Sequence, residues 1–479
     1  PPSNYSMVVE DVTSDTEVLV VGGGPGGYVA AIRAAQHGQD VTLVEKDAYG
    51  GTCLNYGCIP SKAYVSAADV AHRAATGEAM GIHADPAVDL AAMADWKDGV
   101  VTRLTRGVES LCKHAGVTLV DGEATFTGEH TARIVHADDD AGTETIEFEN
   151  AVVATGSQPV ELPDFEFDAE HVLSSKHALA LDAVPDSLLV VGAGYIGMEL
   201  STVFQKLGSD VTVLEMLDAP LPGYEDDVTK GVHERAEDLG VDFHFGLGAE
   251  EWRPAGEGVR VVATDADGNE EKFDATKALV AVGRTPYTEN LGLGELGVEP
   301  DDDGFLATDS VARTNVEHVY AVGDVAGEPM LAHTAMREGT VAADVIAGEA
   351  SALDHQAFPA AVFTDPEIGT VGMTEAEAAE ADFDPVVGQV PLRGNGRALT
   401  LDEKEGFVRI VADDERGFIL GGQVVAPEAS ELIAEIGLAI EMGATLEDVA
   451  GTIHTHPTLS EAVHEAALAA RGEAIHAPN

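Results

Sequence analysis

The chain has 479 residues, of which 45% are hydrophobic, so it is long enough to form several domains with buried cores. Its 26 basic and 85 acidic residues give a formal net charge of -59, and the acidic residues are spread along the whole chain. We therefore expect no nucleic acid and no membrane surface as a partner, because binding to phosphate groups requires positive charge. No stretch approaches the ~20 apolar residues that a membrane span needs.

So acidic a surface opposes folding by self-repulsion in dilute buffer, and molar salt relieves the repulsion by shortening the screening length to about 3 Å. We therefore predict a protein of a salt-rich, halophilic cytoplasm. The start of the chain, Pro1 to Asp15, is acidic and polar rather than basic and then apolar, so no export signal is expected. The three cysteines are too few for a disulfide framework, and no metal site is predicted.

Two segments of the chain repeat one pattern without a gap. Residues 18–45 read VLVVGGGPGGYVAAIRAAQHGQDVTLVE, and residues 188–215 read LLVVGAGYIGMELSTVFQKLGSDVTVLE. In both, an apolar run ends in G-x-G-x-x-G, an amphipathic stretch runs to a single glycine, and a second apolar run closes on a glutamate. Each segment predicts a strand, a tight turn, a helix and a parallel strand.

The glycines and glutamates of these two segments predict dinucleotide binding. The glycines let the backbone approach a pyrophosphate at the positive end of a helix, and Glu45 or Glu215 then accepts hydrogen bonds from ribose hydroxyls. A single motif of this kind could be only a tight turn, whereas two copies with identical spacing indicate two dinucleotides that work together. The glycines concerned are Gly22, Gly24 and Gly27 in the first segment and Gly192, Gly194 and Gly197 in the second.

Further apolar runs end in ATG at residues 154–156, in VGR at 282–284 and in AVGD at 321–324. They predict buried strands whose ends face ligands. The acidic stretches 138–140 and 301–303 are expected to form turns.

These patterns together predict an α/β protein with two Rossmann-like dinucleotide-binding domains. Residues 1–156 form the first domain, residues 157–285 form an inserted second domain, and residues 286–350 complete the first. From 351 to 479 the pattern changes to short strands and helices without a glycine motif, which predicts a third, α+β domain.

The segment GGTCLNYGCIPSK, residues 50–62, carries two cysteines with four residues between them. In a straight helix the α-carbons of Cys53 and Cys58 would lie roughly 8–9 Å apart, beyond the ~7 Å limit for a disulfide. The segment must therefore bend. Gly57 permits the bend, and Pro60 fits the first turn of a helix that begins at or just before Cys58, where the positive end of the helix favours a thiolate.

These features predict a cysteine pair that cycles between dithiol and disulfide. The other interpretations are two buried free cysteines or half of a metal site. Neither is favoured, because no further ligands stand nearby and the motif directly follows a dinucleotide-binding segment. The third cysteine, Cys112, lies in an amphipathic stretch and is expected to be a filler of the core or the surface.

In its motifs and in their order along nearly the whole chain, the sequence resembles the pyridine nucleotide-disulfide oxidoreductases, and among them the branch that oxidises dihydrolipoamide. The shared motifs are GGGPGG, GGTCLNYGCIPSK, ATGS, GAGYIGMEL, AVGD, MLAH and HTHPTLSE. The resemblance implies FAD at the first nucleotide site and NAD at the second. It also implies a C-terminal interface domain that forms a homodimer.

The resemblance implies roles for single residues as well. Cys58 would lie against the flavin as a charge-transfer thiolate, and Cys53 would exchange with the dithiol substrate. His456 would be the catalytic acid and base, and Glu461 would orient its imidazole. The neighbouring His454 is expected to be a surface or packing residue. Other residues expected at FAD are Lys46, Thr52, Lys62, Thr155, Gly156, Ser157, Asp324, Met330, Leu331, Ala332 and His333, and other residues expected at NAD are Tyr195, Ile196, Glu199 and Gly283.

The resemblance also bears on the contacts of three side chains. Lys62 would pair with Glu199, and Tyr195 would cover the nicotinamide pocket. Tyr56 departs from the family pattern, because many relatives carry a small aliphatic residue there. The resemblance therefore does not indicate how the redox loop, the segment between Cys53 and Cys58, is packed.

The implied activity is oxidation of a dihydrolipoyl group by the Cys53–Cys58 disulfide, with electrons passing through FAD to NAD. The expected partner is the lipoyl-bearing acyltransferase component of a 2-oxoacid dehydrogenase or related complex, or free dihydrolipoamide.

One alternative is another NAD(P)H-dependent disulfide reductase. Glutathione-type reductases prefer NADP, whose 2′-phosphate Glu215 would repel, and mercuric reductases need a further cysteine pair, which is lacking after Cys112. Another alternative is a non-catalytic subunit of a complex, and the intact cysteine pair, His456 and Glu461 argue against it.

Overall fold

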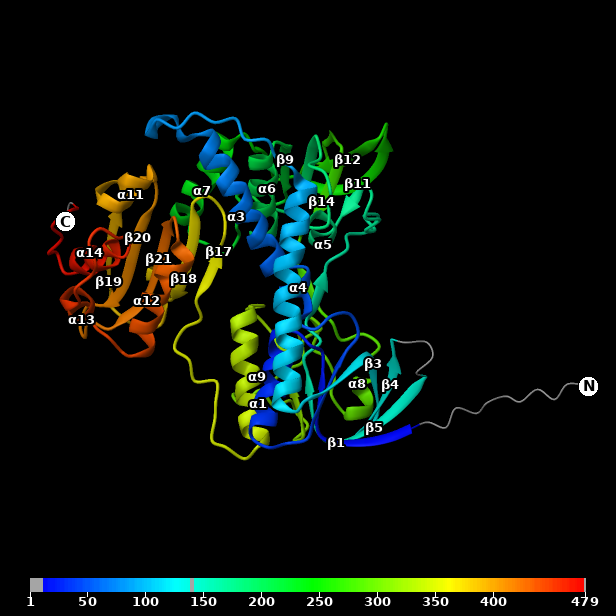
Figure 1. The fold of residues 1–479 in the computed structure, drawn as a ribbon. Coiled ribbons are helices and arrows are strands. Elements are labelled where there is room, and N and C mark those ends of the chain that lie inside the picture. The colour runs from blue at the N-terminus through cyan, green and yellow to red at the C-terminus, as the bar shows by residue number, and fades with distance from the viewer. Residues whose placement is uncertain (1–11, 138–141, 478–479) are drawn as a thin grey trace, which may run out of the picture. The chain divides into compact units, whose positions relative to one another are not determined.

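The computed structural model describes residues 12–137 and 142–477. The predicted turn at 138–140 and the first eleven residues of the chain lie outside the described residues. The chain divides into two compact units, so we describe each by itself (Figure 1). The first unit comprises Pro1–Ala63, Ala91–Val160 and Gly283–Asp354, and the second comprises Tyr64–Leu90, Glu161–Val282 and His355–Asn479.

A six-stranded sheet forms the centre of the first unit. Strands β2, β1, β5 and β16 pair in parallel, β3 continues the parallel pairing beside β2, and β4 joins β3 to β5 in antiparallel order. The apolar runs of β1 and β2 are buried, as expected for parallel strands covered on both faces. The strands are β1 (Val12–Val21), β2 (Val41–Glu45), β3 (Thr118–Gly128), β4 (Thr131–His136), β5 (Thr143–Val153) and β16 (Val319–Ala321).

Helices α1 (Pro25–Gln36) and α9 (Ala332–Ile346) lie side by side against this sheet (Figure 1). They approach closely because Gly339 has no side chain; a Cβ there would lie 2.4 Å from the carbonyl oxygen of Gly26. Cys112 is fully buried in the core of this unit, which confirms the core alternative for this residue. The remaining elements are α2 (Gly51–Asn55), α4 (Leu90–Ala115), β6 (Ser157–Pro159), β15 (Arg284–Pro286), α8 (Leu293–Leu296) and η2 (Gly323–Val325). Helix α3 (Cys58–Ala75) is divided between the units, with residues 58–63 in the first and residues 64–75 in the second.

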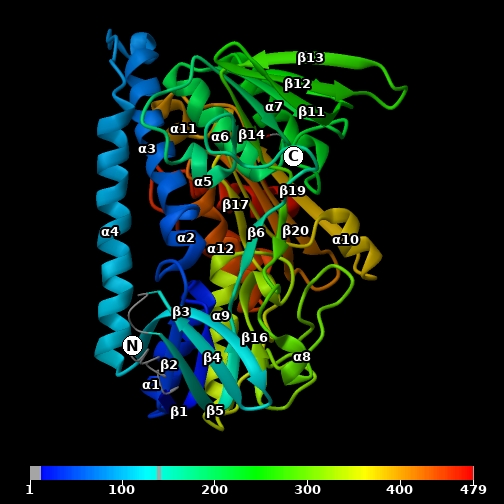
Figure 2. The ribbon, with the colours of Figure 1, turned by 90° about the vertical axis from the view of Figure 1, so that its right-hand side faces the viewer.

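The second unit begins with a five-stranded parallel sheet in the order β10, β9, β8, β14, β7. A separate antiparallel sheet of β11, β12 and β13 belongs to the same unit (Figure 2). The strands are β7 (Val172–Leu173), β8 (Ser187–Val191), β9 (Asp210–Glu215), β10 (Asp242–Phe245), β11 (Gly248–Ala255), β12 (Gly258–Thr264), β13 (Glu270–Ala275) and β14 (Lys277–Val280). The helices are η1 (Gly77–Met80), α5 (Ser175–Ala178), α6 (Tyr195–Leu207) and α7 (Asp226–Leu239).

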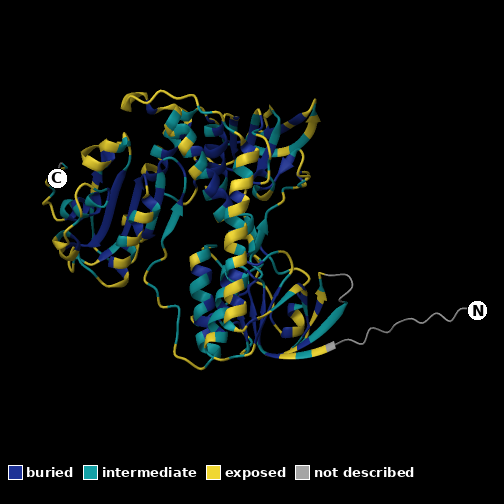
Figure 3. Ribbon diagram, in the orientation of Figure 1, coloured by how far each residue is buried: buried dark blue, intermediate teal, exposed yellow. Residues whose placement is uncertain are grey.

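The C-terminal part of the second unit is an antiparallel sheet in the order β17, β18, β21, β20, β19, with helices packed on it. Figure 3 shows the buried strands β20 and β21 at its centre. Its strands are β17 (Ala360–Val362), β18 (Glu367–Gly372), β19 (Pro385–Pro391), β20 (Phe407–Asp413) and β21 (Ile419–Ala426). Its helices are α10 (Glu375–Glu380), η3 (Leu392–Gly394), α11 (Gly396–Leu401), α12 (Ala429–Glu441), α13 (Leu446–Gly451) and α14 (Glu461–Ala470).

The predicted α/β class with a C-terminal α+β part is confirmed. The predicted buried strands are confirmed as well, because β5, β14 and β16 end just before or within the ATG, VGR and AVGD motifs. The stretch 301–303 is a turn, in which the Asp301 carboxylate accepts hydrogen bonds from the N–H groups of Asp303 and Phe305. The three predicted domain boundaries remain predictions. Among the described residues, no helix is both long and apolar enough to cross a membrane.

Candidate active site

The first glycine motif forms the turn between β1 and α1. Gly22 has φ +105°, and a Cβ there would lie 2.3 Å from the carbonyl oxygen of Ala154. A Cβ on Gly27 would lie 1.8 Å from the oxygen of Gly22, so only glycine lets α1 start so close to the strand. Gly24 precedes the helix and no side chain caps it, which leaves the N–H groups of the first turn suited to an anionic ligand.

The second motif repeats this geometry between β8 and α6. Gly192 has φ +101°, and a Cβ there would lie 2.6 Å from the carbonyl oxygen of Ala281. A Cβ on Gly197 would lie 2.0 Å from the oxygen of Gly192, and Gly194 precedes the helix without a side-chain cap. Both segments therefore form the predicted strand, turn, helix and parallel strand.

The glutamates at the ends of β2 and β9 also match each other. Glu45 accepts hydrogen bonds from the N–H groups of Gly23 (2.6 Å) and Asp47 (2.8 Å). Glu215 accepts them from Ala193 (2.7 Å) and Leu217 (2.9 Å).

A carboxylate oxygen has two lone pairs, so each of these glutamates can also accept bonds from ribose hydroxyls. Glycine-lined helix starts beside carboxylates fit one dinucleotide at each site.

The two predicted redox cysteines lie together at the bend between α2 and α3. A side-chain hydrogen bond joins Cys53 to Cys58, and this bond, followed by burial and the charge of Cys58, raises the pKa of the Cys53 thiol. Cys53 is half-buried and Cys58 is exposed. The chain bends where the spacing requires it, and α3 begins at Cys58. Which cysteine meets the substrate stays a prediction.

Gly57 and Tyr56 lie in the loop between the two cysteines, and their contacts differ. Gly57 does not have a positive φ; its small size matters, because a Cβ would lie 3.1 Å from the carbonyl oxygen of Thr52. The hydroxyl of Tyr56 donates a hydrogen bond to Asp47 (3.1 Å), the residue whose N–H is bound by Glu45. Burial, followed by the charge of Asp47, raises the pKa of Tyr56. Tyr56 thus links the redox loop to the end of β2.

Two residues predicted at FAD meet at Tyr287, which sequence reasoning missed. The hydroxyl of Thr155 donates to the carbonyl oxygen of Tyr287 (2.6 Å), and the Lys46 ammonium lies 3.6 Å from the centroid of its ring. Nothing in the local sequence marks Tyr287, because it lies more than a hundred residues from both partners. Gly156 and Gly283, the other predicted glycines, have φ values of +70° and +127°.

The predicted residues Asp324 and Ser157 are also brought together, since the Ser157 hydroxyl donates to an Asp324 carboxylate oxygen (2.5 Å). Met330 and Leu331 directly precede α9, while Ala332 and His333 begin it. Thr52 lies in α2 of the same unit.

Several predicted residues lie in separate units or on α6. Lys62 and Glu199 belong to different units, so their pairing stays a prediction. The predicted residues Tyr195 and Ile196 open α6, and the side chain of Tyr195 is half-exposed. Glu199 lies further along α6 and accepts a hydrogen bond from the N–H of Phe363 (2.9 Å).

His456 and Glu461 form a hydrogen-bonded pair at the start of α14. The distance from His456 Nδ1 to Glu461 Oε1 is 2.8 Å, and Glu461 Oε2 accepts a bond from the N–H of Thr458 (2.9 Å). Burial acts to raise the pKa of Glu461, but these two hydrogen bonds outweigh it and hold that pKa below its ordinary value. The imidazole is largely exposed, at 78%, and its second nitrogen is left to exchange a proton. The pair borders a cavity of about 460 Å³.

The neighbouring histidine has a different environment. The His454 side chain is only 7% exposed, and its Nε2 lies 2.6 Å from a carboxylate oxygen of Glu435 on α12. Its ring packs beside His464 on α14. His454 therefore joins two helices, which confirms the packing alternative for this residue.

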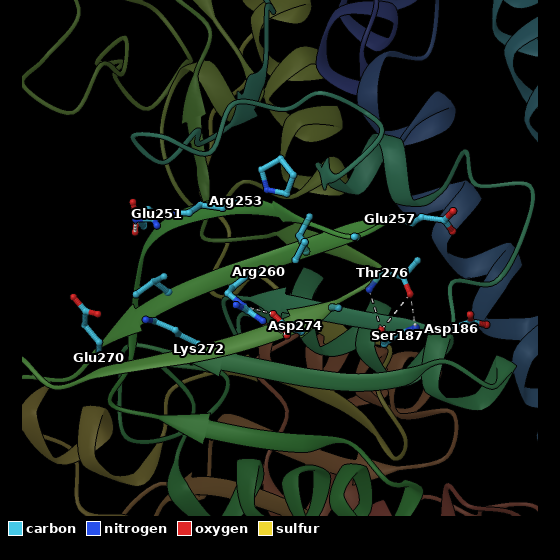
Figure 4. A pocket seen from close by; sticks show the side chains of 17 residues that line it. Asp186, Ser187, Glu251, Arg253, Glu257, Arg260, Glu270, Lys272, Asp274 and Thr276 are labelled. Carbon is cyan, nitrogen blue, oxygen red and sulfur yellow. Dashed lines mark hydrogen bonds and ion pairs between the residues drawn. The ribbon is translucent and has the colours of Figure 1, made fainter.

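A larger hollow of about 850 Å³ lies on the sheet of β11, β12 and β13 (Figure 4). Both of its arginines are paired with carboxylates: Arg260 binds both carboxylate oxygens of Asp274 at 2.6 Å, and Arg253 pairs with Glu251. No cysteine or histidine is among its described lining residues. This hollow therefore lacks the groups that thiol exchange requires.

Residues 16–339 match the family model for pyridine nucleotide-disulphide oxidoreductases, and residues 358–467 match the dimerisation domain of the same family. The chain belongs to the pyridine nucleotide-disulphide oxidoreductases. This family uses FAD and NAD, and the dimerisation domain supports a homodimer.

Several relatives of high identity are dihydrolipoyl dehydrogenases. The chain is 66% identical to dihydrolipoyl dehydrogenase 2 of Haloarcula marismortui, over 98% of this chain and 100% of that relative. It is 63% identical to dihydrolipoyl dehydrogenase of Halobacterium salinarum, over 99% and 100%, and 47% identical to that of Geobacillus stearothermophilus, over 98% and 99%. The predicted resemblance to dihydrolipoamide dehydrogenases of halophiles is confirmed.

A solved structure of the family has the same fold. The crystal structure of LpdA from Mycobacterium tuberculosis has a TM-score of 0.88 and 31% identity, and the alignment covers 94% of this chain and 99% of that one.

Glu338 on α9 is a further, partly buried carboxyl group of this family member. Burial, opposed by a hydrogen bond from the N–H of Gly323, raises the pKa of Glu338 to about 7, and the charge of Asp324 acts in the same direction. A carboxyl group with a raised folded-state pKa stabilises the fold below its unfolded pKa, and this stabilisation is lost as pH rises through about 7.

We therefore expect Glu338→Gln to gain stability relative to the unaltered protein between pH 5 and pH 8. Denaturant unfolding in constant molar salt, at several pH values in this range, measures the free energy of unfolding of both proteins. A difference between these two free energies that does not change with pH would contradict the prediction.

Proposed function

We propose that the chain oxidises dihydrolipoyl groups to lipoyl groups and reduces NAD, using Cys53 and Cys58 as its redox pair. The observation that carries this proposal is the contact between the two cysteines at the start of α3, in a chain with two dinucleotide motifs. The dihydrolipoyl dehydrogenases to which the chain is similar support it. When bound, FAD would supply a two-electron carrier between the reduced cysteines and NAD.

We infer that FAD is held by the first glycine motif with Glu45, and NAD by the second with Glu215. Lys46, Thr155, Ser157 and Asp324 lie in the same unit as the first motif, which supports their assignment to FAD. The assignment extends to the remaining residues that the family resemblance implies: Thr52, Lys62, Gly156, Met330, Leu331, Ala332 and His333 at FAD, and Tyr195, Ile196, Glu199 and Gly283 at NAD.

The thiol exchange conserves its atoms and electrons as follows. A thiolate of the dihydrolipoyl group attacks the sulfur of Cys53, which forms a mixed disulfide and releases Cys58 as a thiolate. His456 takes the proton of the second substrate thiol. That thiolate then attacks the substrate sulfur of the mixed disulfide, closes the lipoyl ring and releases Cys53. Glu461 holds the imidazole in one orientation.

The purified holoenzyme tests this function directly. In molar potassium chloride, NAD reduction should be fast with free dihydrolipoamide and negligible with glutathione or reduced coenzyme A. If either of the other thiols were oxidised faster, the chain would be a different disulfide reductase. If none were oxidised by protein that holds FAD, the non-catalytic alternative would stand.

The finer partner assignment is a lipoyl-bearing acyltransferase component of a 2-oxoacid dehydrogenase or related complex, in the cytoplasm of a halophile. The net charge of -59 supports the salt-rich setting.

Glu215 should set the choice between NAD and NADP. Its carboxylate is buried at the end of β9, where it would repel a 2′-phosphate, so we expect NAD to be preferred by roughly a hundredfold in kcat/KM. Glu215→Gln should narrow this preference. The matched control is Glu45→Gln in the first motif, which should leave the NAD to NADP ratio unchanged. Equal use of both cofactors by the unaltered enzyme would show that the site is wrongly assigned.

We expect His456 to act on the cysteines of the partner subunit. Mixing inactive Cys53→Ser chains with inactive His456→Ala chains should then restore activity, because one site of each mixed dimer has no lesion. Mixing Cys53→Ser with Cys58→Ser is the control and should restore nothing, since each site takes both cysteines from one chain. Mixed dimers of the first kind that stay inactive would place the base within its own subunit. Glu461→Gln alone should slow turnover less than His456→Ala.

A further inference from the structure

The side chain of Asp324 is fixed through two residues of the short β6–β15 sheet. Ser157, at the start of β6, donates its hydroxyl to an Asp324 carboxylate oxygen (2.5 Å). Arg284, at the start of β15, donates from Nε to the same hydroxyl (2.8 Å) and from Nη2 to the backbone oxygen of Ser157 (2.7 Å). The planar guanidinium therefore fixes both the backbone and the side chain of Ser157, and Ser157 in turn orients Asp324.

The backbone of Asp324 is fixed from another direction, by α9. The N–H of Gly323 donates a hydrogen bond to Glu338 Oε2 (2.6 Å). Gly323 has φ +76°, and a Cβ there would lie 3.1 Å from the Cβ of Ala335, also on α9. The turn thus sits directly on the helix, and the carboxyl of Glu338 holds it there.

Glu338 and Asp324 oppose each other electrostatically, because both are acidic and Glu338 is largely removed from water. An apolar side chain of similar size at position 338 would avoid this cost but would leave the N–H of Gly323 without its acceptor. The benefit of the carboxyl therefore lies in fixing the geometry of the Gly323–Asp324 turn.

We propose that Arg284 and Glu338 are positioning residues that hold the carboxylate of Asp324 from two sides in the geometry that FAD requires. The inference rests on the proposed function, which assigns Asp324 to FAD. A carboxylate that is already fixed loses little conformational freedom when the cofactor binds, so the two residues increase the affinity for FAD without having to touch it.

FAD titration of the full-length apoprotein in molar potassium chloride, followed by flavin fluorescence, tests the proposal. Glu338→Leu and Arg284→Met should each raise the Kd for FAD by about tenfold or more. Glu338→Gln should stay within about threefold of the unaltered protein, because the amide oxygen still accepts the bond from Gly323. Arg284→Lys should resemble Arg284→Met, since an ammonium cannot reproduce the fork.

The matched control is Asp344→Leu. Asp344 is a carboxylate of the same helix, but it pairs with Arg33 (2.6 Å) and His37 (2.8 Å) on α1 instead of the turn. Its loss should leave the Kd for FAD unchanged. Circular dichroism of each apoprotein shows whether the variant is folded.

The possible results separate this inference from the proposed function. If folded Glu338→Leu and Arg284→Met bind FAD as tightly as the unaltered protein, the positioning role is wrong. If Glu338→Gln is as weak as Glu338→Leu, or Asp344→Leu is equally weak, the hydrogen bond to Gly323 is not the cause and the inference falls. If the unaltered apoprotein itself takes up no FAD, the proposed function is wrong instead.

Discussion

Replacing Lys206 by methionine should destabilise the second unit by about 3–5 kcal/mol. Lys206 lies on α6, and its side chain is only 4% exposed. Its ammonium is 2.7 Å from a carboxylate oxygen of Asp69 on α3 and 2.7 Å from one of Asp365, which lies between β17 and β18. These are segments far apart in the sequence, so one side chain joins three parts of the unit.

The size of the effect comes from what the substitution leaves behind. Burial acts to raise the pKa of Asp365, but Lys206 and then Arg235 outweigh it and hold that pKa below its ordinary value. Without Lys206, the largely buried carboxylate of Asp365 would keep Arg235, at 3.2 Å, as its cationic partner. An uncompensated buried charge is costly, whereas the intact pair roughly offsets its own desolvation.

Denaturant unfolding in molar potassium chloride measures the loss, with Lys230→Met as control. Lys230 pairs with Glu234 one turn away on α7 at 3.8 Å, but its side chain is 71% exposed, so we expect a change of at most about 0.5 kcal/mol. The two variants should differ in their free energy of unfolding at all salt concentrations that keep the protein folded, because salt screens buried pairs poorly. Equal effects of the two substitutions would contradict this account.

Replacing either Cys53 or Cys58 by serine should lower NAD reduction by dihydrolipoamide at least about a thousandfold, because a hydroxyl cannot form the disulfide. Cys112→Ala is the control. Cys112 is fully buried in the core of the first unit, so its thiol is closed to the substrate, and its loss should leave turnover nearly unchanged and cost about 1 kcal/mol of stability. A Cys53→Ser enzyme that kept its turnover would remove the cysteine pair from the mechanism.

The spectra of the two serine variants should also distinguish the cysteines. A long-wavelength absorption from a thiolate beside the flavin should persist in reduced Cys53→Ser and be lost in Cys58→Ser. The reverse result would exchange the roles assigned to the two residues.

The sequence alone determined the local architecture around the predicted sites. The spacing of Gly22 and Gly27, repeated in the second segment, predicts two strand-turn-helix units because only glycine fits those close approaches. The four residues between Cys53 and Cys58 predict the bend, and α3 begins at Cys58. Such features depend on covalent geometry and hydrophobic periodicity over a few residues, which the sequence states directly.

The tertiary structure decided the contacts between distant segments. The bonds from Arg284 to Ser157 and from Gly323 to Glu338, and the burial of Lys206 among carboxylates, follow no local pattern. The sequence includes Arg284 in the VGR motif and Glu338 five residues after His333, but a charged residue there is equally compatible with a solvated surface. Whether such a residue is buried and paired or exposed to solvent depends on how sheets and helices pack, because burial is what makes a carboxylate or a cation require its partner.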